Sequence, residues 1–233
     1  MTITDGRKPS LDNALARIAR AREHIKSLEA EVGRWSMTGP LPGHIETATV
    51  SFTPSPLCSI LIGEIAYNLK AALDYLVFEL FYLATGDFNN DTKFVIEQTP
   101  AEWNNHFPKF DTLPKREKKL WLHKLKAEHQ AVLKGLQPFS GTTWTASLQR
   151  ITNPDRHREL IRIAGAVTYT KLERLSDARS QVVRDAGLPL ELFVHFEVAT
   201  NVTLKDGVLA IEAMKHLVGE VANVIQGFER DFE

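Results

Sequence analysis

Cysteine is almost missing from this sequence, since Cys58 is the only one among 233 residues. A single thiol cannot form a disulfide within the chain, which excludes the class of small secreted proteins held together by disulfides. The residues after Met1 also lack the continuous apolar run of a secretory signal. We therefore expect a cytoplasmic protein in which Cys58 is a small buried apolar residue.

An excess of charge of one sign is also missing. Lys and Arg total 28, Asp and Glu total 29, and the formal net charge is -1. The chain as a whole therefore has no general attraction for nucleic acid or for an anionic membrane. Any binding of this kind must depend on a local group of basic residues.

Long uninterrupted apolar runs do not occur either. The most apolar stretch, residues 56–85, is interrupted by five polar or charged residues: Glu64, Asn68, Lys70, Asp74 and Glu79. Such residues are poorly tolerated in lipid without partners. This pattern predicts a buried core helix over about residues 57–85, capped by Gly86, and no association with a membrane.

Common catalytic signatures are absent as well. The sequence has no glycine-rich phosphate loop, no Cys-x-x-Cys pair and no His-Glu-x-x-His motif. His123 and His129 are six residues apart, which places them on different faces of a helix. We therefore expect no metal site and no cofactor.

What the sequence does contain is typical of a folded protein: 43% hydrophobic and 24% charged residues, in a chain short enough for a single domain over 1–233. A first helix is predicted after Ser10, with an apolar seam at three-four spacing: Leu11, Ala14, Ile18, Ala21, Ile25, Leu28, Val32 and Trp35. A seam of about three heptads favours a homodimer, unless the chain's own bundle covers it.

The rest of the chain alternates between helical patterns and short strands. Three strands are expected, over residues 48–52, 93–97 and 192–198. Further helices are expected after Thr99, from Lys115 to Lys134, around residues 144–151 and from about Val208 to Phe232. These patterns predict an α+β, mainly helical chain: an antiparallel helical bundle with a small, mainly antiparallel β-sheet.

The densest group of polar residues is RITNPDRHRE, residues 150–159. Because a residue before proline disfavours helical dihedrals, we expect the helix to be interrupted at Asn153, which then caps a new turn. The backbone N–H groups of a new helix start attract anions, so Arg156 and Arg158 could hold a phosphate beside His157 as a proton shuttle. The alternative is that Asn153 is a cap while charged side chains simply pair along the surface: Asp155, Arg158, Glu159 and Arg162.

A second polar group lies inside the predicted core helix. Lys70 and Asp74 are one turn apart among apolar residues, and a buried charge there needs a partner. We expect Asp74 to pair with Lys70 and with Arg156, His157 or Arg158. The alternative is an ion pair that only fixes helix packing. The basic face of the helix ending at Lys134 either follows an RNA backbone or is a solvated surface.

Two segments carry a resemblance. GEIAYNLKAALDYLVFEL and LQRITNPDRHREL resemble an uncharacterised bacterial family with NLRxALDxL and NxDKHR patterns, and the similarity extends to the strand-turn-helix of residues 193–221. More distantly, the chain is similar to HEPN domains, in which an Arg-x4-6-His motif cleaves RNA without metal at a dimer interface. Arg150 and His157 have six residues between them, although Ile151 stands where such nucleases carry a polar residue.

The HEPN resemblance implies a metal-independent endoribonuclease of the toxin or defence type, acting on RNA as a homodimer. His157 would be the general acid or base, with Arg150, Arg156 or Arg158 at the scissile phosphate. The orienting or binding residues would be Asn68, Asp74, Asn153 and Asp155. The alternative is a non-catalytic protein-interaction or ligand-binding module, in which the same residues form a buried network between helices.

Overall fold

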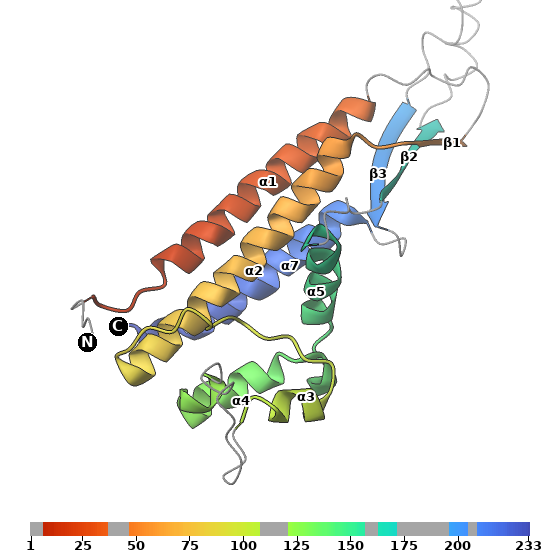
Figure 1. Ribbon diagram of the computed structural model, residues 1–233. Helices are drawn as coiled ribbons and strands as arrows, with labels where there is room; N and C mark the ends of the chain where they lie inside the picture. Colours follow the sequence, from red (N-terminus) through yellow and green to blue (C-terminus); the bar gives the residue numbers. More distant parts are fainter. Residues whose placement is uncertain (1–6, 37–46, 108–120, 157–162, 172–195, 205–208) are drawn as a thin grey trace, which may run out of the picture.

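The computed structural model describes residues 7–36, 47–107, 121–156, 163–171, 196–204 and 209–233. Within these ranges the chain forms six α-helices, three strands and three short 3₁₀ turns. The helices pack as a bundle (Figure 1). The prediction of a mainly helical chain is therefore confirmed.

Two long antiparallel helices, α1 (Asp12–Ser36) and α2 (Pro56–Thr85), form the centre of the bundle (Figure 1). The predicted start of α1 is confirmed, because the backbone N–H of Asp12 donates to Oγ of Ser10 at 3.1 Å. The predicted end of α2 is confirmed as well. Gly86 adopts a left-handed conformation with φ of 68°, and its N–H donates to the carbonyl of Tyr82 at 2.7 Å.

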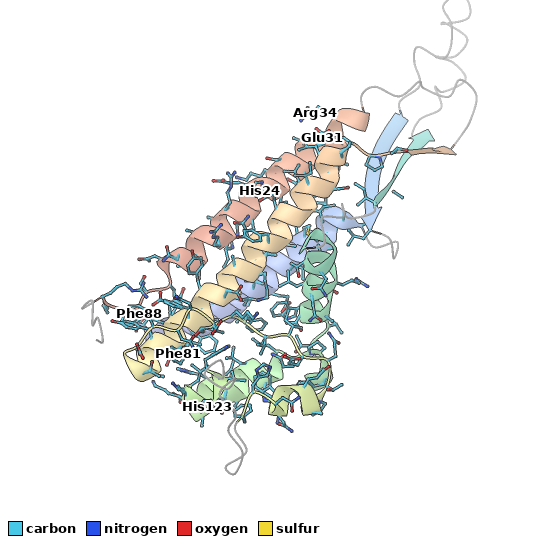
Figure 2. All side chains as sticks on the ribbon, in the orientation of Figure 1. His24, Glu31, Arg34, Phe81, Phe88 and His123 are labelled. Carbon is cyan, nitrogen blue, oxygen red and sulfur yellow. The ribbon has the colours of Figure 1, made fainter. Side chains whose placement is uncertain are left out.

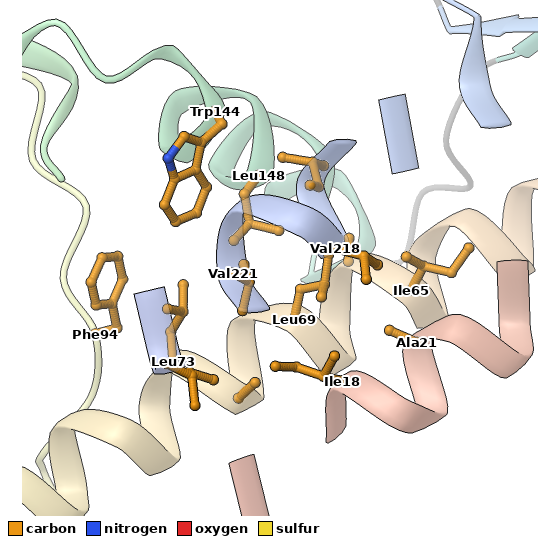
Figure 3. Close-up of a cluster of buried hydrophobic side chains, with 14 of the residues drawn as sticks. Ile18, Ala21, Ile65, Leu69, Leu73, Phe94, Trp144, Leu148, Val218 and Val221 are labelled. Carbon is orange, nitrogen blue, oxygen red and sulfur yellow. The ribbon is translucent and has the colours of Figure 1, made fainter. Parts of the chain in front are cut away.

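A third long helix, α7 (Ala210–Gly227), lies against both α1 and α2 and completes the core (Figure 3). The described seam of α1 is fully inside this core: Leu11, Ala14, Ile18, Ala21, Ile25, Leu28 and Val32. The chain's own helices therefore use the surface on which the homodimer was predicted. The homodimer remains a prediction, and the apolar seam of α1 no longer supports it.

The core helix α2 is long and apolar enough, by length and composition, to cross a membrane, but 67% of its most apolar window is buried inside the protein. Cys58 lies in its first turns and is completely buried, as predicted. Burial of the thiol, followed by the nearby carboxylate of Glu31, raises the pKa of Cys58 to about 11.

Two short helices, α3 (Pro100–Asn104) and α4 (Ala127–Gly135), form the lower part of the molecule in Figure 1, and α5 (Thr143–Arg156) lies above them against α2 and α7. The predicted start of α3 is confirmed, because Thr99 and Glu102 form a capping box. The helix predicted from Lys115 to Lys134 is confirmed over its last eight residues, but the described residues before Ala127 do not belong to it. Leu125 and Lys126 are extended, so α4 starts only at Ala127 after a 3₁₀ turn at Leu122–Lys124.

The strand predicted over residues 93–97 is also wrong. This segment has no strand partner in the described part of the chain, and side chains bind its backbone instead. Gln137 contacts both the carbonyl of Val95 at 3.2 Å and the N–H of Glu97 at 2.8 Å, while Gln149 donates to the carbonyl of Ile96 at 3.0 Å. These amide groups replace the hydrogen bonds of a neighbouring strand.

The predicted interruption at Asn153 does not occur, because α5 continues through Pro154 to Arg156. Pro154 has no N–H to donate, so it removes one helical hydrogen bond, and the helix ends two residues later at Arg156. The helix is held in place by the burial of Trp144, Leu148 and Ile151 against the core. Packing therefore overrides the local preference of the Asn-Pro pair.

The strands β1 (Thr47–Phe52), β2 (Ile163–Lys171) and β3 (Phe196–Leu204) pair antiparallel in the order β1-β2-β3. They lie at the end of the bundle where α1 ends and α2 begins (Figure 1). The strand predicted at 48–52 is β1. The strand predicted over 192–198 begins outside the described residues, and β3 continues it to Leu204. No strand was predicted for β2.

Candidate functional site

A cavity of about 340 Å³ lies beside the middle of α2, where α1, α5 and the loop after α2 meet. It is polar on one side and aromatic on the other. Its lining residues come from four parts of the chain: Arg17, Tyr67, Lys70, Ala71, Asp74, Tyr75, Phe78, Thr92 and Thr152. This volume is within the range of ligand-binding pockets, about 300–1,000 Å³.

Lys70 and Asp74 form the predicted ion pair at this cavity. Nζ of Lys70 lies 2.5 Å from Oδ1 of Asp74, and it also donates to the carbonyl of Phe94 at 2.7 Å. The same Oδ1 accepts the N–H of Phe94 at 2.7 Å. The Lys70 side chain is 11% exposed and that of Asp74 is 37% exposed. The pair therefore fixes residue 94 to α2 while the carboxylate still reaches solvent.

Arg17 brings a second cation to the cavity from α1. Its Nη1 donates to Oδ1 of Asn68 at 3.2 Å, and its guanidinium lies 6.0 Å and 5.8 Å from the ring centres of Tyr67 and Tyr75. No carboxylate contacts Arg17 in the part of the chain that the structure describes. The guanidinium is thus held by an amide and two aromatic faces, with its charge available to a ligand.

Two threonines line the remaining wall. Oγ1 of Thr92 is buried and has no hydrogen-bond partner among the described residues. Among the described residues that line the cavity, Thr152 is the one from α5. Its hydroxyl donates to the carbonyls of Leu148 and Gln149 in the same helix, at 3.0 and 3.2 Å. The Thr92 hydroxyl is therefore a polar group in the cavity wall without a described partner, and its burial keeps it from direct contact with a ligand.

The residues predicted around position 150 are only partly described. Arg150 and Asn153 are exposed on α5, and neither is among the residues that line the cavity. The backbones of Asp155 and Arg156 complete the helix, while their side chains, like all of His157 and Arg158, lie outside the description. The predicted contact between Asp74 and this segment is therefore not described, and the described partners of Asp74 are Lys70 and the backbone of Phe94.

One argument for phosphate binding at Asn153 is wrong. It required a new helix to start there, whereas the described helix is ending. The last turn of a helix carries the negative end of the helix dipole, which attracts cations and not phosphate. Arg156 is at a position that this dipole favours, so an anion must find its positive charge elsewhere.

Asn68 is brought to the site as predicted, but its contact differs from the expected one. It is buried, donates to the carbonyl of Glu64 at 2.8 Å and accepts from Arg17. Arg17, Tyr67 and Tyr75 were not predicted as site residues. One available signal was the spacing of the two tyrosines, because eight residues place both on a single helix face.

Histidines were the other candidates for chemistry. His123 lies beside α4 at the lower end of the molecule (Figure 2), and it is not among the residues that line the cavity. Burial lowers its pKa, and the positive charge of Lys124 lowers it further. Its Nδ1 is buried without a hydrogen-bond partner among the described residues. His123 is therefore neutral at physiological pH.

Comparison with known proteins does not identify the chain. No protein-family model, no curated protein and no solved structure matches it. Any assignment of function must therefore come from the geometry of the chain's own residues.

Proposed function

We propose that this chain binds a small organic anion with a flat ring in the cavity between α1, α2 and α5. The observation that carries the proposal is Arg17, which presents a guanidinium to the cavity without a described carboxylate partner. Lys70 is already paired with Asp74, so Arg17 supplies the positive charge for a ligand.

The rest of the lining complements such a ligand. Tyr67, Tyr75 and Phe78 provide aromatic surface, and Tyr67 is 56% exposed. A phosphate or carboxylate on the guanidinium with a flat ring against a tyrosine is the arrangement by which proteins hold nucleotides and aromatic acids.

The test is calorimetry with inorganic phosphate, AMP and benzoate as probes. We expect binding of at least one probe, reduced about 10- to 150-fold in Arg17→Gln because a charged hydrogen bond contributes about 1.5–3 kcal/mol. Arg20→Gln is the matched control, since Arg20 is on the same helix but pairs with exposed Glu23. Failure of all three probes to bind, or equal affinity in both variants, contradicts the proposal.

Endoribonuclease activity is the second candidate, and Thr152 is the observation that favours it. Thr152 lines the cavity from α5, the helix that ends at Arg156, and His157 is the next residue in the sequence. RNA would then stack a base on Tyr67 and place a phosphate at Arg17. His157 would take the proton of a 2′-hydroxyl, while Arg150, Arg156 or Arg158 would stabilise the charge on the phosphate.

This candidate is tested by incubating wild type and His157→Ala with single-stranded RNA in EDTA. Loss of a general acid or base lowers a rate by about 10²- to 10⁴-fold, so the variant should be nearly inactive while its circular dichroism is unchanged. Equal cleavage by both proteins, or none by wild type, contradicts the nuclease. Neither of these results affects the anion-binding proposal, which the calorimetry tests separately. Sedimentation of the same samples tests the predicted homodimer.

A further inference from the structure

A histidine and two carboxylates converge between α4 and the 3₁₀ turn at Glu229–Asp231. Nε2 of His129, in the first turn of α4, lies 3.2 Å from Oδ1 of Asp231 and 3.9 Å from Oε1 of Glu128. All three ligand atoms lie within 4.8 Å of one another. His129 is 2% exposed, and the edge of its ring packs on Phe228 at 5.5 Å between ring centres.

This geometry fits a metal ion. Zinc bonds to imidazole nitrogen and carboxylate oxygen are about 2.0–2.2 Å long, so the ligands of a tetrahedral ion are about 3.3 Å apart. The described distances need only small rotations of the Glu128 side chain, which is 68% exposed. A cavity of about 500 Å³ adjoins the same three residues, leaving room for a water as the fourth ligand.

We infer that His129, Glu128 and Asp231 bind a divalent transition metal ion of the zinc class. One imidazole nitrogen with two carboxylates suits zinc or cobalt better than the all-oxygen sites of calcium and magnesium. The ion ties the 3₁₀ turn at Glu229–Asp231 to α4, two segments that are far apart in the sequence. This site was not predicted, because Asp231 is 102 residues from His129 along the chain.

Two features of the site lower its expected affinity for the metal ion. Nζ of Lys126 lies 3.7 Å from Glu128 and 4.0 Å from Asp231, so its ammonium competes with the ion for both carboxylates. Nδ1 of His129 is buried without a hydrogen-bond partner among the described residues. A partner at that second nitrogen usually strengthens metal binding about 10- to 100-fold. We therefore expect weaker binding than in zinc sites with a complete outer set of hydrogen bonds.

The experiment uses the full chain, freed of metal and titrated with Zn²⁺ by calorimetry and with Co²⁺ by visible absorption. We expect one equivalent of either ion and a higher melting temperature with Zn²⁺. Asp231→Asn preserves the size of the side chain, which is partly exposed, so the fold should be retained. The substitution should weaken Zn²⁺ binding at least about tenfold, because one charged ligand is lost. Lys126→Met should strengthen it.

The matched control is His216→Asn. Nδ1 of His216 lies 3.8 Å from Oε1 of Glu220, so this histidine also has a carboxylate beside it. The His216 side chain is 62% exposed, however, and His216 belongs to no group of three metal-binding side chains among the described residues. The control should bind as wild type does. The inference is overturned if wild type binds no ion, if Asp231→Asn binds as tightly as wild type, or if His216→Asn removes the bound equivalent.

Discussion

Nη2 of Arg7 lies 2.6 Å from Oε1 of Glu79, which joins the segment before α1 to the last part of the core helix α2. The Glu79 side chain is only 1% exposed, and its other oxygen accepts the N–H of Ser10 at 3.2 Å. The guanidinium also faces the rings of Phe78 and Tyr82 at 6.0 and 5.4 Å. A buried carboxylate is thus compensated by a residue outside any helix.

Replacing Arg7 by Gln should lower the free energy of unfolding by about 2 kcal/mol, because Glu79 loses its charged partner while remaining buried. Arg7 itself is 34% exposed, so the loss should be below the about 3–5 kcal/mol of fully buried pairs. Urea unfolding measures it. Arg20→Gln, which breaks an exposed pair, should change stability by less than about 1 kcal/mol. Equal effects of the two substitutions would contradict the role given to Glu79.

Replacing Asp74 by Ala should destabilise the chain by about 2 kcal/mol. The change leaves the ammonium of Lys70 without its carboxylate and the N–H of Phe94 without an acceptor. Asp74→Asn retains an acceptor oxygen and should lose less. Thermal unfolding of both variants separates the two contributions, and an unchanged melting temperature for the alanine variant would show that the contacts are unimportant for stability.

Two glycines should respond to alanine with opposite signs. Gly86 has a φ of 68°, a conformation that side chains disfavour, so Gly86→Ala should cost about 1 kcal/mol. Gly219 is inside α7, and a Cβ added there would meet no atom within 4 Å. Gly219→Ala should stabilise by about 0.5–1 kcal/mol. Denaturant unfolding of both variants measures the two changes in the free energy of unfolding and shows whether they have opposite signs.

His123 should make stability depend on pH. Its pKa in the folded chain is below the ordinary value of 6.5, chiefly because of burial, so the unfolded chain binds a proton more readily. This contribution is fully present above about pH 6.5 and is lost as the pH falls toward the folded pKa. Unfolding at pH 7.5 and pH 5.5 should therefore show a smaller acid loss for His123→Gln than for wild type. Equal losses would rule out this assignment.

The thiol of Cys58 should be unreactive in the folded chain. It is completely buried and its pKa is about 11, so almost no thiolate is present near neutral pH. A colorimetric thiol reagent at pH 8 should react with it slowly, and quickly once guanidinium unfolds the protein. Rapid reaction under native conditions would show that the start of α2 opens readily.

The helices were predictable where their signals are local. Ser10 and Gly86 mark helix ends through chemistry confined to one turn, and the apolar seam of α1 is visible in the sequence alone. The segment 93–97 has an apolar pattern typical of a strand, yet its partners are side chains from α2, from α5 and from Gln137, two residues after α4. Contacts between such distant positions leave no local pattern, so the strand prediction failed.

In the candidate site, too, the residues with a local signal were predicted and those that depend on distant contacts were not. Asn68, Lys70 and Asp74 are conspicuous because they are polar residues in an apolar helix, and all three contribute to the cavity or to its wall. Arg17 is one of several arginines on an amphipathic helix, and nothing in its neighbours along the chain distinguishes it. Its position between Tyr67 and Tyr75 arises only when α1 packs on α2.

The order of the core helices along the chain has a consequence for folding during synthesis. The helices α1 and α2 are neighbours in the sequence, so their hairpin can close as soon as both have left the ribosome. The third wall of the core, α7, emerges much later, after α5 and the strands. Until then the side of α2 that α7 covers stays exposed to solvent, and the nascent chain is a natural client for chaperones that bind apolar surface.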